Sequence, residues 1–135
     1  MGSQRLDERV LIIEDDADYA RYLEIRLQHD GAQTWIAASG EQGLDAVNDF
    51  QPTVVITDVG LPGIDGLTVV RRLRADPRRR RLPILILSSA DRNDEIAEVV
   101  GIGLVWYLRK GCDWHVASRT IHNLLAKARE VPLAS

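Results

Sequence analysis

Five short apolar runs alternate with longer amphipathic stretches along the chain. The runs occupy residues 9–14, 32–37, 53–57, 83–87 and 104–108. The first, third and fourth are almost continuous in Val, Ile and Leu, as expected for strands covered on both faces, and the second is more polar. Between and after them, apolar residues recur at helical spacing, for example at Ala20, Leu23 and Leu27 before Gly31. The pattern predicts five strands and five helices.

Strict alternation of strands and helices is typical of an α/β fold. Each strand is followed by a helix that crosses over to the next parallel strand, and such crossovers are right-handed. Five units of this kind predict an open, doubly wound parallel sheet with helices on both faces. In such sheets, ligands bind at the carboxyl ends of the strands.

Composition limits the possibilities further. The 135 residues suffice for one domain, and the formal net charge of -3 with a pI near 5.6 does not indicate a nucleic-acid or membrane surface. No apolar run approaches the ~20 residues that span a bilayer, and the N-terminus lacks the apolar core of a signal peptide. The single cysteine, Cys112, excludes an internal disulfide. We therefore expect a cytoplasmic protein.

Polar residues follow four of the predicted strands. They are Glu14, Asp15 and Asp16 after the first strand, Asp58 after the third, Ser88 and Ser89 after the fourth, and Lys110 after the fifth. Since the carboxyl ends of parallel strands share one edge of the sheet, these groups are expected to converge.

The converging groups have the chemistry of a phosphoryl-transfer site. Neighbouring carboxylates repel each other, and Mg²⁺ with oxygen ligands relieves that repulsion. Lys110 and Ser88 are suited to bind phosphoryl oxygens, and Asp58 could act as the nucleophile that forms an acyl phosphate. For Asp58 taken alone, the alternative is a turn aspartate that caps the loop before Pro62. For the acids after the first strand, the alternative is a helix N-terminal cluster, with Asp16 as the cap.

Four segments carry a resemblance to a known family. The stretches VLIIEDDADYAR, VVITDVGLPGIDGL, LPILILSSA and WYLRK occur in this order, and the chain resembles the receiver domain of two-component response regulators. The resemblance covers residues 9–130, which leaves an extension at 1–8 and a tail at 131–135. It implies a flavodoxin-like α/β fold with five helices and the strand order 2-1-3-4-5.

The resemblance also implies roles for individual residues. Asp58 matches the phosphorylated aspartate, and Asp15 matches the acid that ligates Mg²⁺ directly. Glu14 matches a neighbour that acts through water, and Gly60 stands where the family offers a backbone carbonyl to the metal.

Further positions match the part of the family that responds to phosphorylation. Ser88 matches the switch hydroxyl, Tyr107 the aromatic residue that turns inward with it, and Lys110 the lysine that binds the phosphoryl group. The implied partner is a histidine kinase or a histidine phosphotransfer protein. A homodimer could form through the face made by the fourth helix, the fifth strand and the last helix.

The chain departs from the family pattern at a few positions. Gly111 replaces the usual proline after the lysine, which predicts a more flexible turn and resembles receivers of multidomain hybrid signalling proteins. The sequence could therefore be part of a longer protein. Gly60 and Ala90 lack the side chains that often tune attack by water, so we expect slow loss of the phosphoryl group.

Two other functions are compatible with parts of this pattern. A degenerate receiver could act as an interaction module without phosphorylation, but the charged site residues are all present. A Mg²⁺-dependent phosphatase needs a further acid two residues after the nucleophile, and this chain has Gly60 there, which disfavours that function. The arginine-rich run at 74–83 is expected to be a solvated loop, because the overall charge is acidic, and direct nucleic-acid binding is not expected.

Overall fold

The computed structural model describes residues 5–89 and 91–130, and its centre is a five-stranded parallel sheet with the order β2-β1-β3-β4-β5. The predicted fold class is confirmed. The strands are β1 (Arg9–Ile13), β2 (Gln33–Ala37), β3 (Val54–Thr57), β4 (Ile84–Ser88) and β5 (Val105–Arg109). The helices are α1 (Ala17–His29), α2 (Gly40–Phe50), α3 (Gly66–Ala75), α4 (Asn93–Val100) and α5 (Trp114–Ala128), with a short 3-10 turn at Pro77–Arg79.

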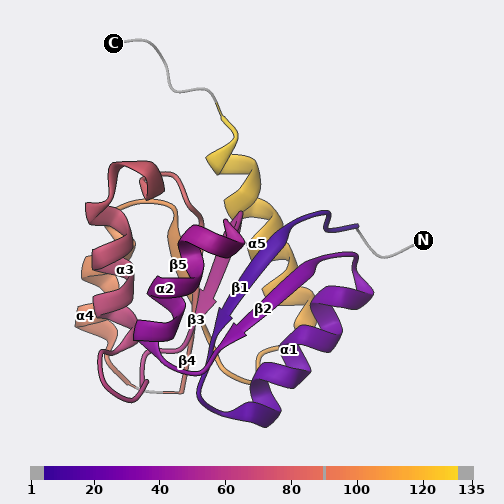
Figure 1. Ribbon diagram of the computed structural model, residues 1–135, viewed down its shortest axis with the longest axis horizontal. Helices are drawn as coiled ribbons and strands as arrows, with labels where there is room; N and C mark the ends of the chain where they lie inside the picture. The colour runs from indigo at the N-terminus through magenta and orange to yellow at the C-terminus, as the bar shows by residue number, and fades with distance from the viewer. Residues whose placement is uncertain (1–4, 90, 131–135) are drawn as a thin grey trace.

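Helices cover both faces of the sheet (Figure 1). Strand β1 shows why, because its side chains alternate between two separate cores. Leu11 and Ile13 pack into the core beneath α2, α3 and α4, whereas Val10 and Ile12 pack into the core beneath α1 and α5. All four side chains are fully buried. Burial on both faces explains the unbroken apolar runs of the central strands.

Each observed strand boundary lies within one residue of the predicted run. Strand β5 begins at Val105 because Leu104 has a φ of 57°, outside the strand region. Helix α4 begins at Asn93, since Arg92 before it is not helical. At the start of α2, Ser39 is the N-cap and accepts a bond from the Gln42 N–H, while the Gln42 side chain accepts one from the Ala38 N–H.

The described part of the N-terminal extension packs against the domain. Leu6 is buried in the core beneath α1 and α5, and its N–H donates to the carbonyl of Asp30 at 2.7 Å. Residues 131–135 of the predicted tail lie outside the described residues. Among the helices of the described chain, none is long and apolar enough to cross a membrane.

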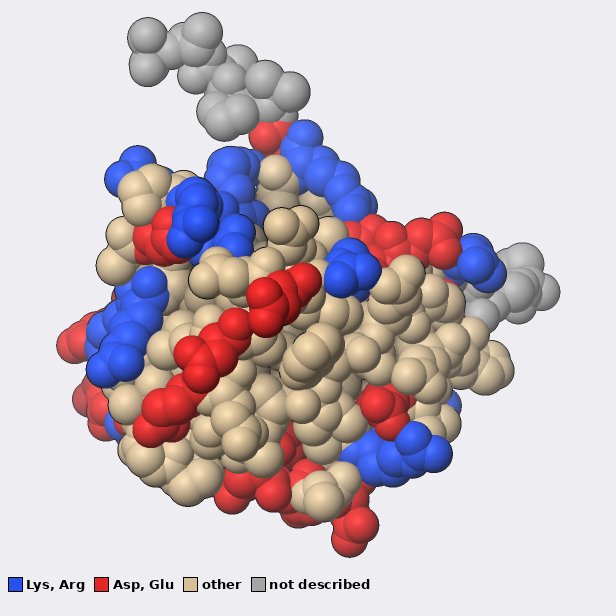
Figure 2. All heavy atoms as spheres, viewed as in Figure 1, with Lys and Arg blue, Asp and Glu red and all other residues tan. Residues whose placement is uncertain are grey.

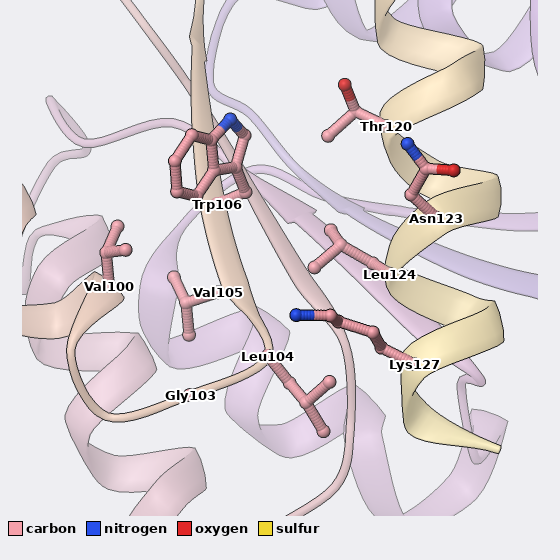
Figure 3. A pocket seen from close by; sticks show the side chains of 9 residues that line it. All are labelled: Val100, Gly103, Leu104, Val105, Trp106, Thr120, Asn123, Leu124 and Lys127. Atoms are coloured by element: carbon pink, nitrogen blue, oxygen red, sulfur yellow. The ribbon is translucent and has the colours of Figure 1, made fainter. Parts of the chain in front are cut away.

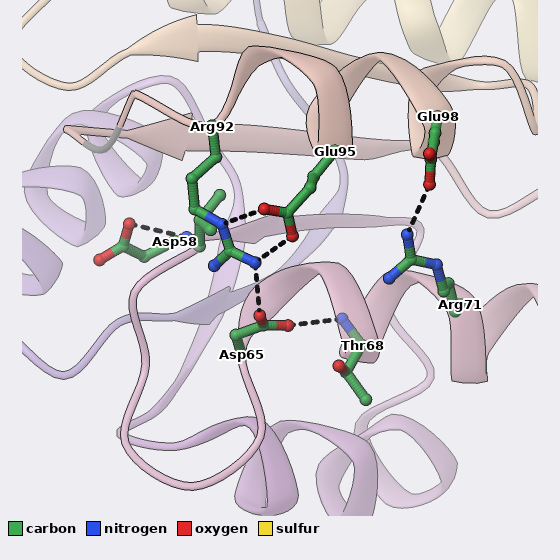
Figure 4. A network of polar contacts seen from close by, with 8 residues as sticks. Asp58, Asp65, Thr68, Arg71, Arg92, Glu95 and Glu98 are labelled. Carbon is green, nitrogen blue, oxygen red and sulfur yellow. Dashed lines mark hydrogen bonds and ion pairs between the residues drawn. The ribbon is translucent and has the colours of Figure 1, made fainter.

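Ion pairs join α3 to α4 (Figure 4). Asp65 is the N-cap of α3 and accepts a bond from the Thr68 N–H through Oδ1, while its Oδ2 lies 3.0 Å from a guanidinium nitrogen of Arg92. Arg92 also pairs with Glu95 in the first turn of α4. Near the other end of these helices, Arg71 of α3 lies 3.3 Å from Glu98 of α4, and both side chains are exposed.

The Asp65–Arg92 pair makes stability depend on pH. Burial alone would raise the pKa of Asp65, but the hydrogen bonds from Thr68 and Arg92 outweigh it and lower the pKa below its ordinary value of 3.8. A lowered folded pKa gives a stabilisation that is complete above the unfolded value and is lost as the pH falls through the folded value. Asp65→Asn keeps the cap but removes the charge. We expect it to lower the free energy of unfolding by about 0.5–1 kcal/mol at neutral pH.

Urea unfolding of both proteins between neutral pH and about pH 2 checks this expectation, since the difference should shrink towards the acid end. Arg92→Gln supplies the control, because in its background Asp65→Asn should cost less. A difference that stays constant with pH would contradict the role assigned to the ion pair.

Candidate functional site

The side chain of Lys110, which follows β5, contacts two carboxylates that follow β1 and β3. Its ammonium nitrogen lies 2.6 Å from Oε1 of Glu14, which follows β1, and 3.0 Å from Oδ2 of Asp58, which follows β3. The backbone N–H of Lys110 donates to the carbonyl of Ser88, the last residue of β4, at 3.0 Å. The structure therefore brings together the groups that the strand-end pattern predicted.

Asp58 is held by hydrogen bonds to the backbone of β1 and of the residue that follows it. Its N–H donates to the carbonyl of Ile13 at 3.0 Å, and its Oδ1 accepts a bond from the Val59 N–H at 2.7 Å. The residue is only 7% exposed. A charged carboxylate at this depth needs compensation, which the ammonium of Lys110 supplies.

The three acids after β1 have different surroundings. Glu14 is buried, and its Oε2 accepts a bond from the Asp16 N–H at 3.1 Å. Asp15 is exposed. Asp16 caps α1, as predicted, because its Oδ1 accepts bonds from the N–H groups of Asp18 and Tyr19.

Glu14, Asp15 and Asp58 could hold a metal ion together. Each offers one carboxylate oxygen, and these oxygens lie within 4.8 Å of one another. A set of carboxylate oxygens is the donor set that hard divalent cations such as Mg²⁺ prefer. The residues present therefore fit Mg²⁺, with Asp15 on the solvent side where water ligands have access.

Burial and pairing shift the pKa values in this site. Burial raises the pKa of Glu14 above its ordinary value of 4.5, and the hydrogen bonds from Lys110 and Asp16 only partly offset it. For Lys110, burial alone would lower the pKa, but hydrogen bonds to Glu14 and Asp58 outweigh it and the pKa is raised. Lys110 is therefore cationic at neutral pH.

The other predicted site residues lie around this centre. Ser88 is buried at the end of β4, in line with a place beside the site. Tyr107 points outward, with 42% of its surface exposed and its ring 5.6 Å from that of Trp106. Gly60 is exposed in the loop after Asp58. Ala90 lies outside the described residues, so the expectation attached to it stays a prediction.

Sequence reasoning did not assign a role to two residues that shape the site. A Cβ at Gly66 would lie 1.8 Å from the carbonyl oxygen of Asp58, so only glycine permits this approach of α3. The ring of Tyr19 lies 4.9 Å from the ammonium of Lys110, and its hydroxyl accepts a bond from the Gly111 N–H. Gly66 lies in the GIDGL segment, so the sequence does mark its position. The contact of Tyr19 joins residues far apart in sequence, and no local pattern indicates it.

The turn after Lys110 also depends on glycine. Gly111 has a φ of 83°, a left-handed conformation that side chains other than glycine rarely adopt. Proline, which the family usually has at this position, requires a φ near -65° and could not adopt this conformation.

A groove lies between β5 and α5, on the face that the resemblance assigns to dimerisation (Figure 3). It has a volume of about 420 Å³, with Trp106 of β5 at one side and Thr120, Asn123 and Lys127 of α5 at the other. Trp106 is 48% exposed.

Comparisons with known proteins identify the family of the chain and relatives with the same fold. The family model described as "Response regulator receiver domain" matches residues 10–121. The chain is 44% identical over 93 residues to the transcriptional regulatory protein AfsQ1 of Streptomyces coelicolor, which covers 69% of this chain and 39% of AfsQ1. It is 37% identical over 95 residues to the DNA-binding response regulator MtrA of Mycobacterium tuberculosis, covering 70% of this chain and 40% of MtrA.

Solved structures have the same fold. A putative response regulator from Chloroflexus aurantiacus superposes with a TM-score of 0.81 at 34% identity, covering 90% of this chain and 99% of that one. A sensor protein from Polaromonas superposes with a TM-score of 0.80 at 30% identity, covering 89% and 97%.

The close approach at Gly66 gives a test of the site's architecture. Gly66→Ala must push α3 away from the Asp58 carbonyl, and we expect it to lower the free energy of unfolding by about 3 kcal/mol. Gly60→Ala is the matched control, because a Cβ there meets nothing within 4 Å and should change stability by no more than ~0.5 kcal/mol. Chemical denaturation measures both, and equal effects would contradict the role given to Gly66.

Proposed function

The chain belongs to the response regulator receiver domain family, and from this premise we propose that Asp58 accepts a phosphoryl group from a histidine kinase or a histidine phosphotransfer protein. The observation that carries the proposal is the contact of the Lys110 ammonium with both Glu14 and Asp58. This contact supports the proposal because it places a carboxylate that can act as the nucleophile beside further acids and one cation.

In the proposed reaction, a carboxylate oxygen of Asp58 attacks the phosphorus of the phosphohistidine. The O–P bond forms and the P–N bond breaks, and the histidine leaves as neutral imidazole because its other ring nitrogen already carries a proton. The buried position of Asp58 keeps bulk water away from the acyl phosphate. Lys110 then exchanges its contact with the Asp58 carboxylate for one with the phosphoryl oxygens, and the hydroxyl of Ser88 donates to the same group.

Mg²⁺ held by Glu14, Asp15 and Asp58, with the Gly60 carbonyl as a further ligand, would neutralise charge on the phosphoryl oxygens. Without it, three acids face one lysine, which is an excess of negative charge that repels an incoming phosphate. The catalysis in this proposal is limited to the domain's own phosphorylation and dephosphorylation, as in a signalling switch.

The switch would act through Ser88 and Tyr107. Movement of Ser88 towards the phosphoryl group leaves room for the outward-facing ring of Tyr107 to turn inward, which changes the surface of α4, β5 and α5. The groove beside Trp106 supports this face as the site of a homodimer. We assign residues 9–130 to the receiver domain and the cytoplasm as its location.

The chain spans about 40% of the length of the curated relatives that it matches. The output functions of these longer relatives, including the DNA binding named for MtrA, are therefore not transferred to this chain.

Phosphorylation is tested with phosphoramidate and Mg²⁺. We expect the unmodified chain to gain one phosphoryl group by intact mass and Asp58→Asn to gain none, while Asp65→Asn, which changes a nearby acid outside the metal cluster, still gains it. Beryllofluoride with Mg²⁺ should alter the tryptophan fluorescence of the chain only where Asp58 is present. Failure of the unmodified chain in both assays would favour a degenerate receiver that acts as an interaction module.

The metal site is tested with two neighbouring acids that carry the same charge. Asp15→Asn should weaken Mg²⁺ binding by at least about tenfold, because it removes a ligand. Asp16→Asn should bind like the unmodified chain, since asparagine can also cap α1. Calorimetric titration with Mg²⁺ compares the two, and equal weakening would indicate that general charge rather than ligation holds the ion.

A further inference from the structure

The domain carries a dense cationic patch that the proposed function does not use. Six arginines and one aspartate lie between residues 72 and 81, in a chain whose net charge is -3. We call the set formed by these arginines and the two cations at the end of α5 the basic end. Its members are Arg72, Arg74, Arg78, Arg79, Arg80, Arg81, Lys127 and Arg129.

The basic end lies away from the phosphoacceptor site. Arg81 precedes β4, whereas Ser88 ends it, so the two sites lie at opposite ends of that strand. Arg81 also donates to the carbonyls of Lys127 and Ala128 at 2.9 and 3.0 Å, which holds the arginine run against the end of α5. Figure 2 shows Lys and Arg side chains gathered at this upper end of the molecule.

Most of this charge is not neutralised. Arg78 pairs with Asp76, and Arg129 pairs with Glu8. Arg74 instead donates to the carbonyls of Arg79, Gly103 and Leu104. A carbonyl accepts a hydrogen bond without cancelling the charge, and burial lowers the pKa of Arg74 only to about 10, which leaves it cationic at neutral pH.

Other arginines of the basic end are equally uncompensated. Arg79 donates to the side-chain amide of Asn48, and Arg81 donates to the carbonyls of α5. Arg72 and Arg80 are exposed and form no ion pair among the described residues. The guanidinium groups that donate to carbonyls are thus held in place before any partner binds, which reduces the entropy cost of binding.

The surroundings of these cations favour a phosphate backbone over an acidic protein. Stable protein interfaces depend on exposed aromatic or aliphatic anchors. The exposed large hydrophobic residues of the described chain all lie outside residues 72–81 and 125–130. Between Arg78, Arg81 and Arg129 runs a groove of about 330 Å³ with Leu82 and Pro83 in its lining. Such a groove offers cations to phosphates and an apolar surface to the sugars between them.

We propose that the basic end binds the sugar-phosphate backbone of duplex DNA, without reading its sequence. The net charge of the chain argues against this only as an average, because it does not describe the local charge: six arginines lie between residues 72 and 81, with one aspartate among them. Binding of this kind is electrostatic and falls steeply with salt, since each phosphate contact releases counterions.

The test is fluorescence anisotropy of a labelled duplex, with the full chain added at about 20 mM and about 150 mM salt. We expect binding at low salt and its loss at the higher salt. Arg72→Ala/Arg80→Ala, which removes two exposed cations that form no ion pair, should weaken binding about tenfold at low salt. It should also reduce the slope of log affinity against log salt by about 2.

Arg109→Ala/Arg119→Ala is the matched control, because it removes the same charge from exposed positions at the end of β5 and in the first half of α5. This variant should bind DNA like the unmodified chain. Equal weakening in both variants would overturn the proposal, as would no binding at low salt. Binding of poly-glutamate in place of DNA would also overturn it and indicate an acidic protein partner.

Discussion

The ammonium of Lys110, placed between Glu14 and Asp58, is the interaction on which the site depends. Both carboxylates are buried, and two buried like charges without a cation would destabilise the fold. One lysine ties the loop after β5 to the loops after β1 and β3, and its backbone N–H adds the end of β4. The same group therefore holds the loops together and prepares the pocket for a phosphoryl group.

This arrangement separates charge along the sheet. All strands are parallel, so their carboxyl ends share one edge of the sheet, where Glu14, Asp15 and Asp58 lie. The C-terminal ends of the helices lie at the opposite edge. Arginine and lysine side chains in the last turns of α3 and α5 are favourable there because the carbonyl end of a helix attracts cations. A domain with a modest net charge thus carries an arginine-rich patch at the edge opposite the phosphoacceptor site, and a separate partner is proposed for each.

Several features of the site could be predicted from the sequence, because each depends on local pattern. Apolar periodicity locates the strands, and a parallel sheet brings the residues after its strands to one edge. Asp58 and Lys110 are found together for this reason, although they are 52 positions apart. Asp16 caps α1 as predicted, because capping needs only residues within one turn.

Other features depend on contacts that no local pattern contains. The Arg92–Asp65 pair and the ring of Tyr19 beside Lys110 join segments that only the packed fold brings together. The role of Gly66 follows from how closely α3 approaches the carbonyl of Asp58, which is a distance and not a residue type. The start of β5 was wrong by one residue because Leu104 adopts an unusual φ that its side chain does not predict.

By itself, the sequence determined the order of strands and helices, the family and the chemical types of the site residues, because these follow from periodicity and from short motifs. Only the tertiary structure decided which carboxylates share the lysine, which residue must be glycine beside Asp58, and which arginines of the basic end have no acidic partner. The physical reason is that charge, burial and close approach depend on distances in space, and distances between remote segments exist only once the helices have packed on both faces of the sheet.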